Sequence, residues 1–329
     1  MRGEFGRTVR VAARWLAAAA LGLAPAIAVG QEWPNRPIRA IVAFTPGSAT
    51  DIVGRVVAER LAVFLGQPVV VENRVGAGGT IGANAVAKAE PDGYTILFNS
   101  SAHASNPAIY ATLPYDTFKD FINVTALAGQ PNVLIVNPDR GYKSVQDLVA
   151  AAQGKPGQLN YSSAGVGSGT HLNAEKFRLT AGVDMVHIPH KGTPEATADV
   201  VAGRVEFYFC PITAALALVK GNKVQALAVS TLKRSPALPD VPTTVEAGFP
   251  KSEYVLWVGM WLPAKTPPAI VERLHAATIK VLDLPDVKER LAKLGAEPMP
   301  MGLSEFDTFM RSEVDDALRI TRAAGIKPN

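Results

Sequence analysis

The stretch IRAIVAFTPGSATDIVGRVVAERL, residues 38–61, joins an apolar run to a helical pattern through a turn of small and hydroxylated residues. The apolar run over 38–44 predicts a strand. Apolar residues then recur every three to four positions, which predicts a helix near 51–65. An S-x-x-D sequence starts at Ser48 and has the form of a capping box, so Ser48 or Thr50 is the expected N-cap. The stretch therefore predicts a strand–loop–helix unit.

A second stretch, LNYSSAGVGSGTH at residues 159–171, repeats this organisation. A strand-like run passes through glycines into a helical pattern that Ser168 or Thr170 could cap. The first N–H groups of a helix are unpaired and the helix dipole favours negative charge there, so such loops can bind an anion without a charged side chain. Ordinary capped turns are the alternative, but two such loops favour a binding function shared between two lobes.

Strand-like runs alternate with helical patterns through most of the chain, which predicts an α/β architecture with parallel sheets and crossover helices. A proline-rich stretch over 235–268 includes one apolar run, YVLWVGMWLP, and three helical patterns follow it. We expect this C-terminal part to return to the first lobe. The expected strands are 38–44, 68–73, 95–100, 133–137, 159–164, 185–190, 205–209 and 224–230, with a proline-broken connection between 100 and 133. The expected helices are 51–65, 79–89, 144–153, 170–182, 269–283, 285–294 and 304–324.

Residues 1–30 have the composition of a cleaved export signal, with an uncleaved anchor as the alternative. They contain four arginines, one glutamate, an apolar run too short to span a bilayer and an A-x-A site. We therefore expect an exported protein that lies outside the cytoplasm. Removing this segment leaves 29 basic and 28 acidic residues from the 33 and 29 of the whole chain, a net charge of +1. This balance gives no indication of a nucleic-acid partner.

Motifs of nucleotide-binding and hydrolytic enzymes do not match. GAGGTIGA at 76–83 and GVGSGT both lack the last glycine of G-x-G-x-x-G, and neither a P-loop nor G-x-S-x-G is present. His187 and His190 are a close pair without a third metal ligand at recognisable spacing. A thiolate pair of Cys210 with His190 is conceivable, but a buried strand end is the favoured interpretation of that cysteine. We expect no catalytic residue, no cofactor and no metal.

Four longer stretches carry a family resemblance: FTPGSATDIVGRVVAERL, GQPVVVENRVGAGGTIGANAVAKAEPDGYTILF, NPAIYATLPYD and LKRSPALPDVPTTVEAGFP. They resemble the Bug-type (TctC-like) family, the periplasmic solute-binding proteins of tripartite tricarboxylate transporters. The resemblance covers almost the whole chain after residue 30, and its motifs are long and specific.

The resemblance implies a two-lobed type II periplasmic binding protein fold, each lobe a mainly parallel sheet flanked by helices. Lobe 1 would comprise residues 31–128 and 256–329, and lobe 2 residues 129–255. A small organic carboxylate would bind in the cleft between the lobes and pass to a membrane permease of the tripartite tricarboxylate type. We expect a monomer without enzymatic activity.

The resemblance also implies that three loops line the cleft. Asp51 matches a typical acid of the family, but its charge would repel a carboxylate, so we assign it to capping and loop geometry. Carried onto this sequence residue by residue, the expected ligand-binding positions are Gly47, Ser48, Ala49, Thr50, Ser100, Ser101, Ala164, Gly165, Gly167, Ser168 and Thr170, with His190 and Cys210 as further candidates.

Three positions depart from the family pattern. Ser48 falls where glycine is common, His190 where tyrosine is frequent, and Cys210 where aspartate is common. If that aspartate binds an amino group, Cys210 argues against an amino-acid ligand. The sequence leaves open which carboxylate is bound, whether it is aliphatic or aromatic, and whether His190 and Cys210 contact it. A ligand-sensing module for a membrane receptor kinase is an alternative function, and a periplasmic hydrolase is another.

Overall fold

The computed structural model describes residues 33–328, so the export signal predicted for residues 1–30 lies outside it. The chain from Arg36 onward forms one unit built around a ten-stranded mixed sheet. Within the described residues, no helix combines the length and apolarity needed to cross a membrane.

The sheet has two halves that share one long strand, β4 (Phe121–Val136). Its hydrogen-bonded order is β2-β1-β3-β9-β4-β7-β5-β6, with β8 and β10 also paired to β4. The first half contains β1 (Ile38–Val42), β2 (Val69–Asn73), β3 (Thr95–Ser100), β9 (Val255–Pro263) and β10 (Glu297–Pro298). The second half contains β5 (Asn160–Ser163), β6 (Val186–Pro189), β7 (Phe207–Pro211) and β8 (Gln225–Val229).

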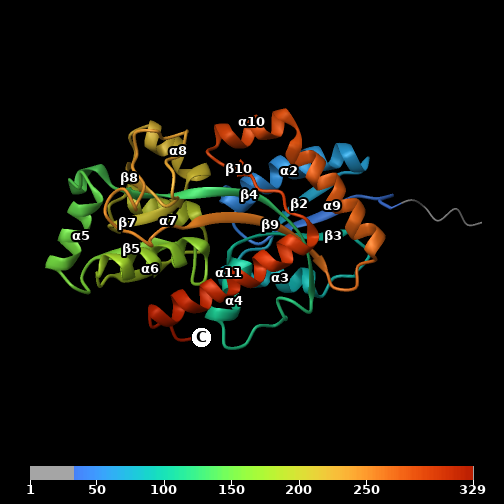
Figure 1. The fold of residues 1–329 in the computed structure, drawn as a ribbon, viewed down its shortest axis with the longest axis horizontal. Coiled ribbons are helices and arrows are strands. Elements are labelled where there is room, and N and C mark those ends of the chain that lie inside the picture. Colours follow the sequence, from blue (N-terminus) through green and yellow to red (C-terminus); the bar gives the residue numbers. More distant parts are fainter. Residues whose placement is uncertain (1–32, 329) are drawn as a thin grey trace, which may run out of the picture. The chain divides into compact units, whose positions relative to one another are not determined.

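Strand β4 changes partner in the middle of its length. Up to Pro131, which is registered with Val255, it pairs with β9, and from Asn132, which is registered with Pro211, it pairs with β7. A proline has no N–H to donate to a ladder, so it fits a position where the pairing changes. In Figure 1, β4 and β9 run side by side through the centre, with α5 to α8 at one end and α2, α3 and α9 at the other.

Helices flank both halves of the sheet. In the first half, α9 and α10 pack on α2, and α11 packs on α4. The C-terminal helices therefore return to the N-terminal strands and helices, as the sequence predicts. The helices are α2 (Ala49–Leu65), α3 (Thr80–Ala87), α4 (Ala102–Ile109), α5 (Val145–Gly154), α6 (Gly169–Ala181), α7 (Thr193–Val201), α8 (Ile212–Lys220), α9 (Pro268–Asp283), α10 (Pro285–Lys293) and α11 (Leu303–Ala323).

The structure corrects three sequence predictions. The sheets are parallel only in β2-β1-β3 and β6-β5-β7, because every pairing of β4 and β9 is antiparallel. The connection after residue 100 contains the helix α4, which tolerates Pro107, and β4 begins twelve residues before the predicted 133–137 run. Small and polar residues along both segments concealed their structure. The helices α7 and α8 were also not predicted.

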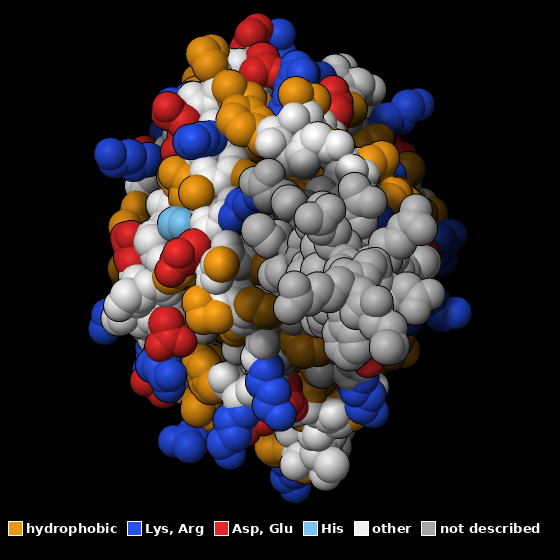
Figure 2. Space-filling model, turned by 90° about the vertical axis from the view of Figure 1, so that its right-hand side faces the viewer, with side chains coloured by type: hydrophobic (Ala, Val, Ile, Leu, Met, Phe, Trp, Pro, Cys, Tyr) orange, Lys and Arg blue, Asp and Glu red, His pale blue; other side chains and the backbone are white. Residues whose placement is uncertain are grey.

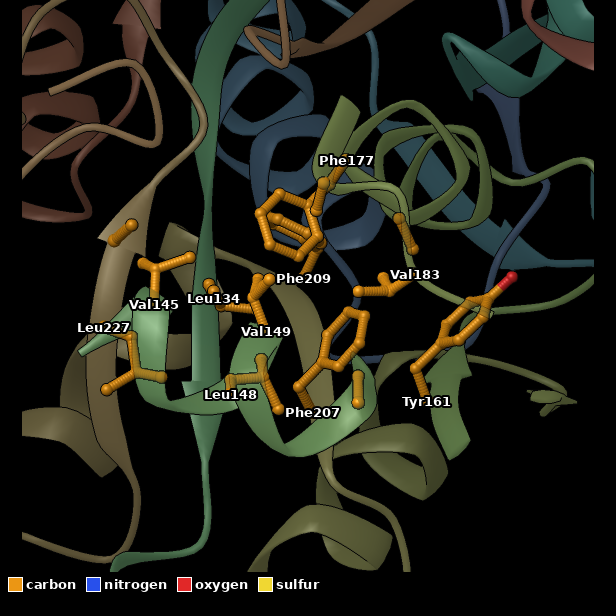
Figure 3. Close-up of a cluster of buried hydrophobic side chains, with 14 of the residues drawn as sticks. Leu134, Val145, Leu148, Val149, Tyr161, Phe177, Val183, Phe207, Phe209 and Leu227 are labelled. Carbon is orange, nitrogen blue, oxygen red and sulfur yellow. The ribbon is translucent and has the colours of Figure 1, made fainter. Parts of the chain in front are cut away.

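Each half has its own apolar core. In the second half, Leu134 of β4, Phe177 of α6 and Phe207 and Phe209 of β7 interlock between the sheet and α5 (Figure 3). In the first half, Trp257 and Trp261 of β9 pack against Phe306 of α11. Fully burying one such aromatic side chain contributes about 1.5–3 kcal/mol. These cores fix the loops that leave β1, β3 and β5.

The surface carries both signs of charge. Over the described part of the face shown in Figure 2, lysine and arginine side chains are interspersed with aspartate and glutamate. This agrees with the near balance of charge after residue 30 and fits a partner that is not a polyanion.

Candidate functional site

The two predicted strand–loop–helix units are present, one in each half of the sheet. Ser48 caps α2, with its Oγ accepting the N–H of Asp51 at 3.3 Å. Ser168 caps α6 in the same way, accepting the N–H of His171 at 3.3 Å. Ser48 and Ser168 are therefore the caps among the alternatives that the sequence left open. Both helix starts are buried, so their remaining N–H groups face protein or ligand rather than bulk water.

Asp51 organises the first loop, as predicted. Its carboxylate accepts hydrogen bonds from Gly47 N at 3.0 Å, Arg55 Nε at 3.0 Å and Asn73 Nδ2 at 2.9 Å. Burial alone would raise the pKa of Asp51, but the hydrogen bonds from Arg55, Gly47 and Asn73 outweigh it and hold the pKa below its usual range. The charge is thus neutralised within the loop, and the carboxylate closes the turn.

Loops from the two halves of the sheet touch each other. Ser105 of α4 donates to Gly167 O at 2.7 Å, and Tyr254 OH donates to Ser101 Oγ at 3.2 Å. The approach is close enough to require glycine, because a Cβ on Gly78 would lie 2.5 Å from Val166 O. A Cβ on Gly192 would clash with Thr45 in the same way. These contacts hold loops of the two halves against each other.

A cavity of about 260 Å³ remains between these loops. On the side of the first half it is lined by Phe44, Tyr110 and the loop Gly76–Gly79. On the other side it is lined by the segments 164–166 and 189–191. Its wall is therefore mostly backbone, aromatic ring and small apolar side chain, with His190 and Lys191 as basic side chains at its edge.

Buried polar groups without hydrogen-bond partners lie along the junction of the two halves, and one of these residues, Asn99, adjoins Gly79 of the cavity wall. Among residues 33–328, Asn99 Nδ2, Gln130 Nε2, Asn132 Oδ1, Asn173 Nδ2 and Thr213 Oγ1 have no hydrogen-bond partner, although each of these residues is at most 8% exposed. An unsatisfied buried donor or acceptor costs about 1–3 kcal/mol. Such groups are the expected contacts of a polar ligand and its bridging waters.

Several backbone donors predicted to face a ligand are engaged within their own loops. Gly47 N donates to Asp51, Ala164 N to Thr170 Oγ1 at 3.0 Å, and Gly165 N to Ser163 Oγ at 3.1 Å. Gly167 N donates to His171 Nδ1 at 3.3 Å, and Ser168 N to Gly165 O at 3.1 Å. These bonds give the loops their shape, so the donors left for a ligand are the helix-start N–H groups of residues 49–50 and 169–170.

The remaining predicted positions lie in different surroundings. Ala164, Gly165 and His190 line the 260 Å³ cavity, whereas Gly47 borders an open apolar cavity between α7 and α8. Ser100 Oγ accepts the N–H of Ala102 at 3.3 Å, and Ser101 N donates to Trp257 O at 2.9 Å. Both serines are buried where β3 meets α4.

Cys210 lies in the core of the second half and is fully buried. Burial raises the pKa of its thiol to about 12, and Thr197 Oγ1 lies 3.7 Å from its Sγ. His190 Nε2 instead lies 3.1 Å from Asp199 Oδ2, an electrostatic contact without hydrogen-bond alignment. The conceivable Cys210–His190 thiolate pair is therefore wrong. No three His, Cys, Asp or Glu side chains within residues 33–328 are placed to hold a metal ion.

Sequence reasoning missed the wall formed by Phe44, Tyr110 and the loop Gly76–Gly79, and the polar pair Gln130 and Asn132. A signal for the pair was present, because polar residues flank Pro131 inside an otherwise apolar run. For the loop, the glycine cluster matches no nucleotide motif, and the resemblance does not place it among the three loops expected to line the cleft. The structure shows that these glycines allow close approach of the opposite loop.

Two α/β halves that share the long strand β4 and enclose a cavity between their loops define the class of two-lobed solute-binding proteins. Comparison with known proteins identifies the family. The family model "Tripartite tricarboxylate transporter family receptor" matches residues 53–326. The chain belongs to this receptor family, as the resemblance of its sequence motifs implies.

Three solved structures show how far the similarity extends. The periplasmic binding protein BugD is 32% identical, with a TM-score of 0.86 over 90% of this chain and 100% of its own. Rpa4515 of R. palustris with adipate is 33% identical, with a TM-score of 0.88 over 91% and 100% of the two chains. MatC of Rhodopseudomonas palustris with bound malate is 32% identical, with a TM-score of 0.83 over 88% and 99%.

Proposed function

We propose that this chain is a periplasmic solute-binding protein that captures a small organic carboxylate between two lobes and delivers it to a tripartite tricarboxylate-type membrane permease. It acts as a monomer, has no catalytic activity and is exported through a cleaved signal over residues 1–30. One observation carries the proposal: two buried, serine-capped helix starts, α2 and α6, belong to opposite halves of the sheet beside an uncharged polar junction. The adipate and malate in two related structures support a carboxylate ligand.

The lobes are residues 31–128 with 256–329, and residues 129–255. The change of partner of β4 between Pro131 and Asn132 supports the first boundary, and the start of β9 at Val255 supports the second. Two extended strands without a helix at the crossing form a hinge that can bend without breaking either core. Closure lets both helix starts contact one ligand, so a ligand that bridges them shifts the population toward the closed form.

Energetics allow binding without an arginine clamp. A micromolar ligand needs about 8 kcal/mol net. Hydrogen bonds to a charged group contribute about 1.5–3 kcal/mol each, and a helix N-terminus adds about 0.3–2 kcal/mol. Four to six donors from the two helix starts and the uncharged polar groups at the junction therefore suffice, after association costs of at least about 4 kcal/mol.

Calorimetric titration with a panel of mono- and dicarboxylates, including malate and adipate, tests the proposal. We expect micromolar binding of at least one acid and a smaller radius of gyration by X-ray scattering when it binds. If no acid in the panel binds at millimolar concentration and none compacts the protein, the proposed function is wrong.

Ala49→Pro is the sharpest variant for locating the anion. Ala49 is the first residue of α2, where proline is well tolerated, and Ser48 before it is already extended at φ −72° and ψ 162°. The substitution removes one free N–H donor and keeps the helix, so we expect about tenfold weaker binding, or about 1.4 kcal/mol. Leu303→Pro makes the same change at the start of α11 and should leave affinity unchanged. Equal affinities for both variants would place the anion elsewhere.

A further inference from the structure

Two histidines lie ring on ring behind the loop that leads into α6. His171 comes from the first turn of α6 and His187 from β6, and their ring centroids are 4.0 Å apart with planes at 14°. Tyr161 of β5 stacks on His187 at 5.0 Å and 16°. Three elements of the second half therefore place an aromatic stack against this loop.

Both imidazoles contact the loop through nitrogen atoms that accept hydrogen bonds. Gly167 N lies 3.3 Å from His171 Nδ1, and a backbone N–H can only donate, so this nitrogen carries no proton. His187 Nε2 lies 2.6 Å from Ser163 Oγ, which itself accepts the N–H of Gly165 at 3.1 Å. The Ser163 hydroxyl carries one proton, and its two acceptors are His187 Nε2 and Gly165 O, which lies 3.2 Å away. The shorter distance favours His187. The imidazole pair therefore connects to two backbone N–H groups of the loop: Gly167 N bonds directly to His171, and Gly165 N bonds to the Ser163 hydroxyl that contacts His187.

The surroundings keep both rings neutral. Burial lowers the pKa of His171 to about 4, with the positive charge of Arg178 adding to the effect. Burial lowers the pKa of His187 to about 3, and the neighbouring His171 and His190 outweigh the opposing effect of Glu175. Glu175 is engaged with Tyr161 OH and Arg178, so it has no hydrogen bond to either imidazole.

We propose that His171 and His187 are positioning residues that hold the loop over residues 163–168 in its ligand-receiving shape by accepting the N–H of Gly167 and the hydroxyl of Ser163. This inference rests on the proposed function, because that loop forms one side of the candidate cleft. A proton on either ring removes an acceptor and places a positive charge inside the stack. The loop is released, and ligand binding is lost with it.

Paired variants separate the acceptor from the ring. His171→Asn keeps an acceptor near the position of Nδ1, whereas His171→Phe keeps a stacking ring without one. By amide hydrogen exchange measured with NMR, we expect the Gly167 amide to exchange about five- to tenfold faster in His171→Phe and within twofold of the parent in His171→Asn. In the parent, the Gly167 amide shift should titrate with a pKa near 4. In His171→Asn that titration should disappear.

The control is His103→Phe, which replaces a fully buried histidine of α4 whose nitrogens have no partner in the described chain. It should leave Gly167 exchange unchanged. Unchanged exchange in His171→Phe, or equally fast exchange in His171→Asn, would overturn the proposal. If His171→Phe does not fold, the titration of the parent protein tests the proposal instead. A Gly167 amide shift that does not change down to pH 3.5 would then overturn it.

Binding of malate and adipate to the same variants adds the functional readout. We expect His171→Phe to weaken whichever acid the parent binds by at least fivefold, and His171→Asn to restore it. If the parent binds neither acid, the proposed function fails for these ligands, while the exchange result still decides the role of the imidazoles.

Discussion

Replacing Asp51 with asparagine should lower the free energy of unfolding by more than the loss of a surface ion pair does. Asp51 is 4% exposed, and its Oδ2 accepts the N–H of Gly47 while its Oδ1 accepts Arg55 and Asn73. In Asp51→Asn, the new amide group faces the Gly47 N–H, so one charge-assisted bond worth about 1.5–3 kcal/mol is lost. The other two bonds become weaker neutral ones. We expect the free energy of unfolding to fall by roughly 2–4 kcal/mol.

Urea unfolding at pH 7 measures this loss, with Asp286→Asn as the matched control. Asp286 of α10 pairs with Arg60 of α2, the helix that contains Asp51, but both side chains are well exposed, so the loss of this pair should cost about 0–1 kcal/mol. The pKa of Asp51 is lowered in the folded state, so its contribution is present above the unfolded pKa and is lost as pH falls through the folded one. Equal losses in the two variants at pH 7 would refute this account of the loop.

Two further predictions concern acid stability and closure. The pKa is lowered to about 3 for His103, about 4 for His171 and about 3 for His187, so the unfolded chain binds their protons first and stability falls as pH drops below 6.5. Each imidazole should lower the free energy of unfolding by about 2 kcal/mol at pH 5. Urea unfolding at pH 7.5 and pH 5 should show that His103→Phe removes about a third of this decrease. A decrease as large as that of the parent would contradict the prediction. Gly192→Ala should hold the lobes apart, giving a larger radius of gyration and at least tenfold weaker ligand binding. Gly154→Ala has open space around its Cβ and is the control, so matching scattering curves for the two variants would show that the cleft closes without this contact.

Local signals made the strand–loop–helix units predictable from sequence. Ser48 and Ser168 cap α2 and α6, and both helices have apolar periodicity, so residues within a few positions determine them. The role of Asp51 followed from charge alone. Strand β4 was found only in its apolar second half, because Gln130, Pro131 and Asn132 are typical of a turn unless β9 is present to pair with them.

The finer features of the site depend on contacts between distant parts of the chain. The sequence does not show that the N–H groups of Gly165 and Gly167 are engaged by Ser163 and His171. Nor does it show that His171 and His187, on different elements, lie face to face. Such facts require the register of β5 and β6, which local patterns do not determine. The family resemblance predicts which loops line the cleft, but it does not show which of their donors remain free.

The insertion of β9 between β3 and β4 sets a constraint on the order of assembly. Residues 255–263 pair with residues 121–131 on one side, and residues 258–261 pair with residues 97–100 on the other, so the first half of the sheet is incomplete until the last quarter of the chain is available. Closing so long a loop delays folding, because its entropy is lost before the contacts form. Until β9 has been synthesised, the edges of β3 and β4 that it will pair with stay unpaired, and strands of other chains can pair with them. A chain truncated before Val255 should aggregate rather than fold as a separate N-terminal lobe.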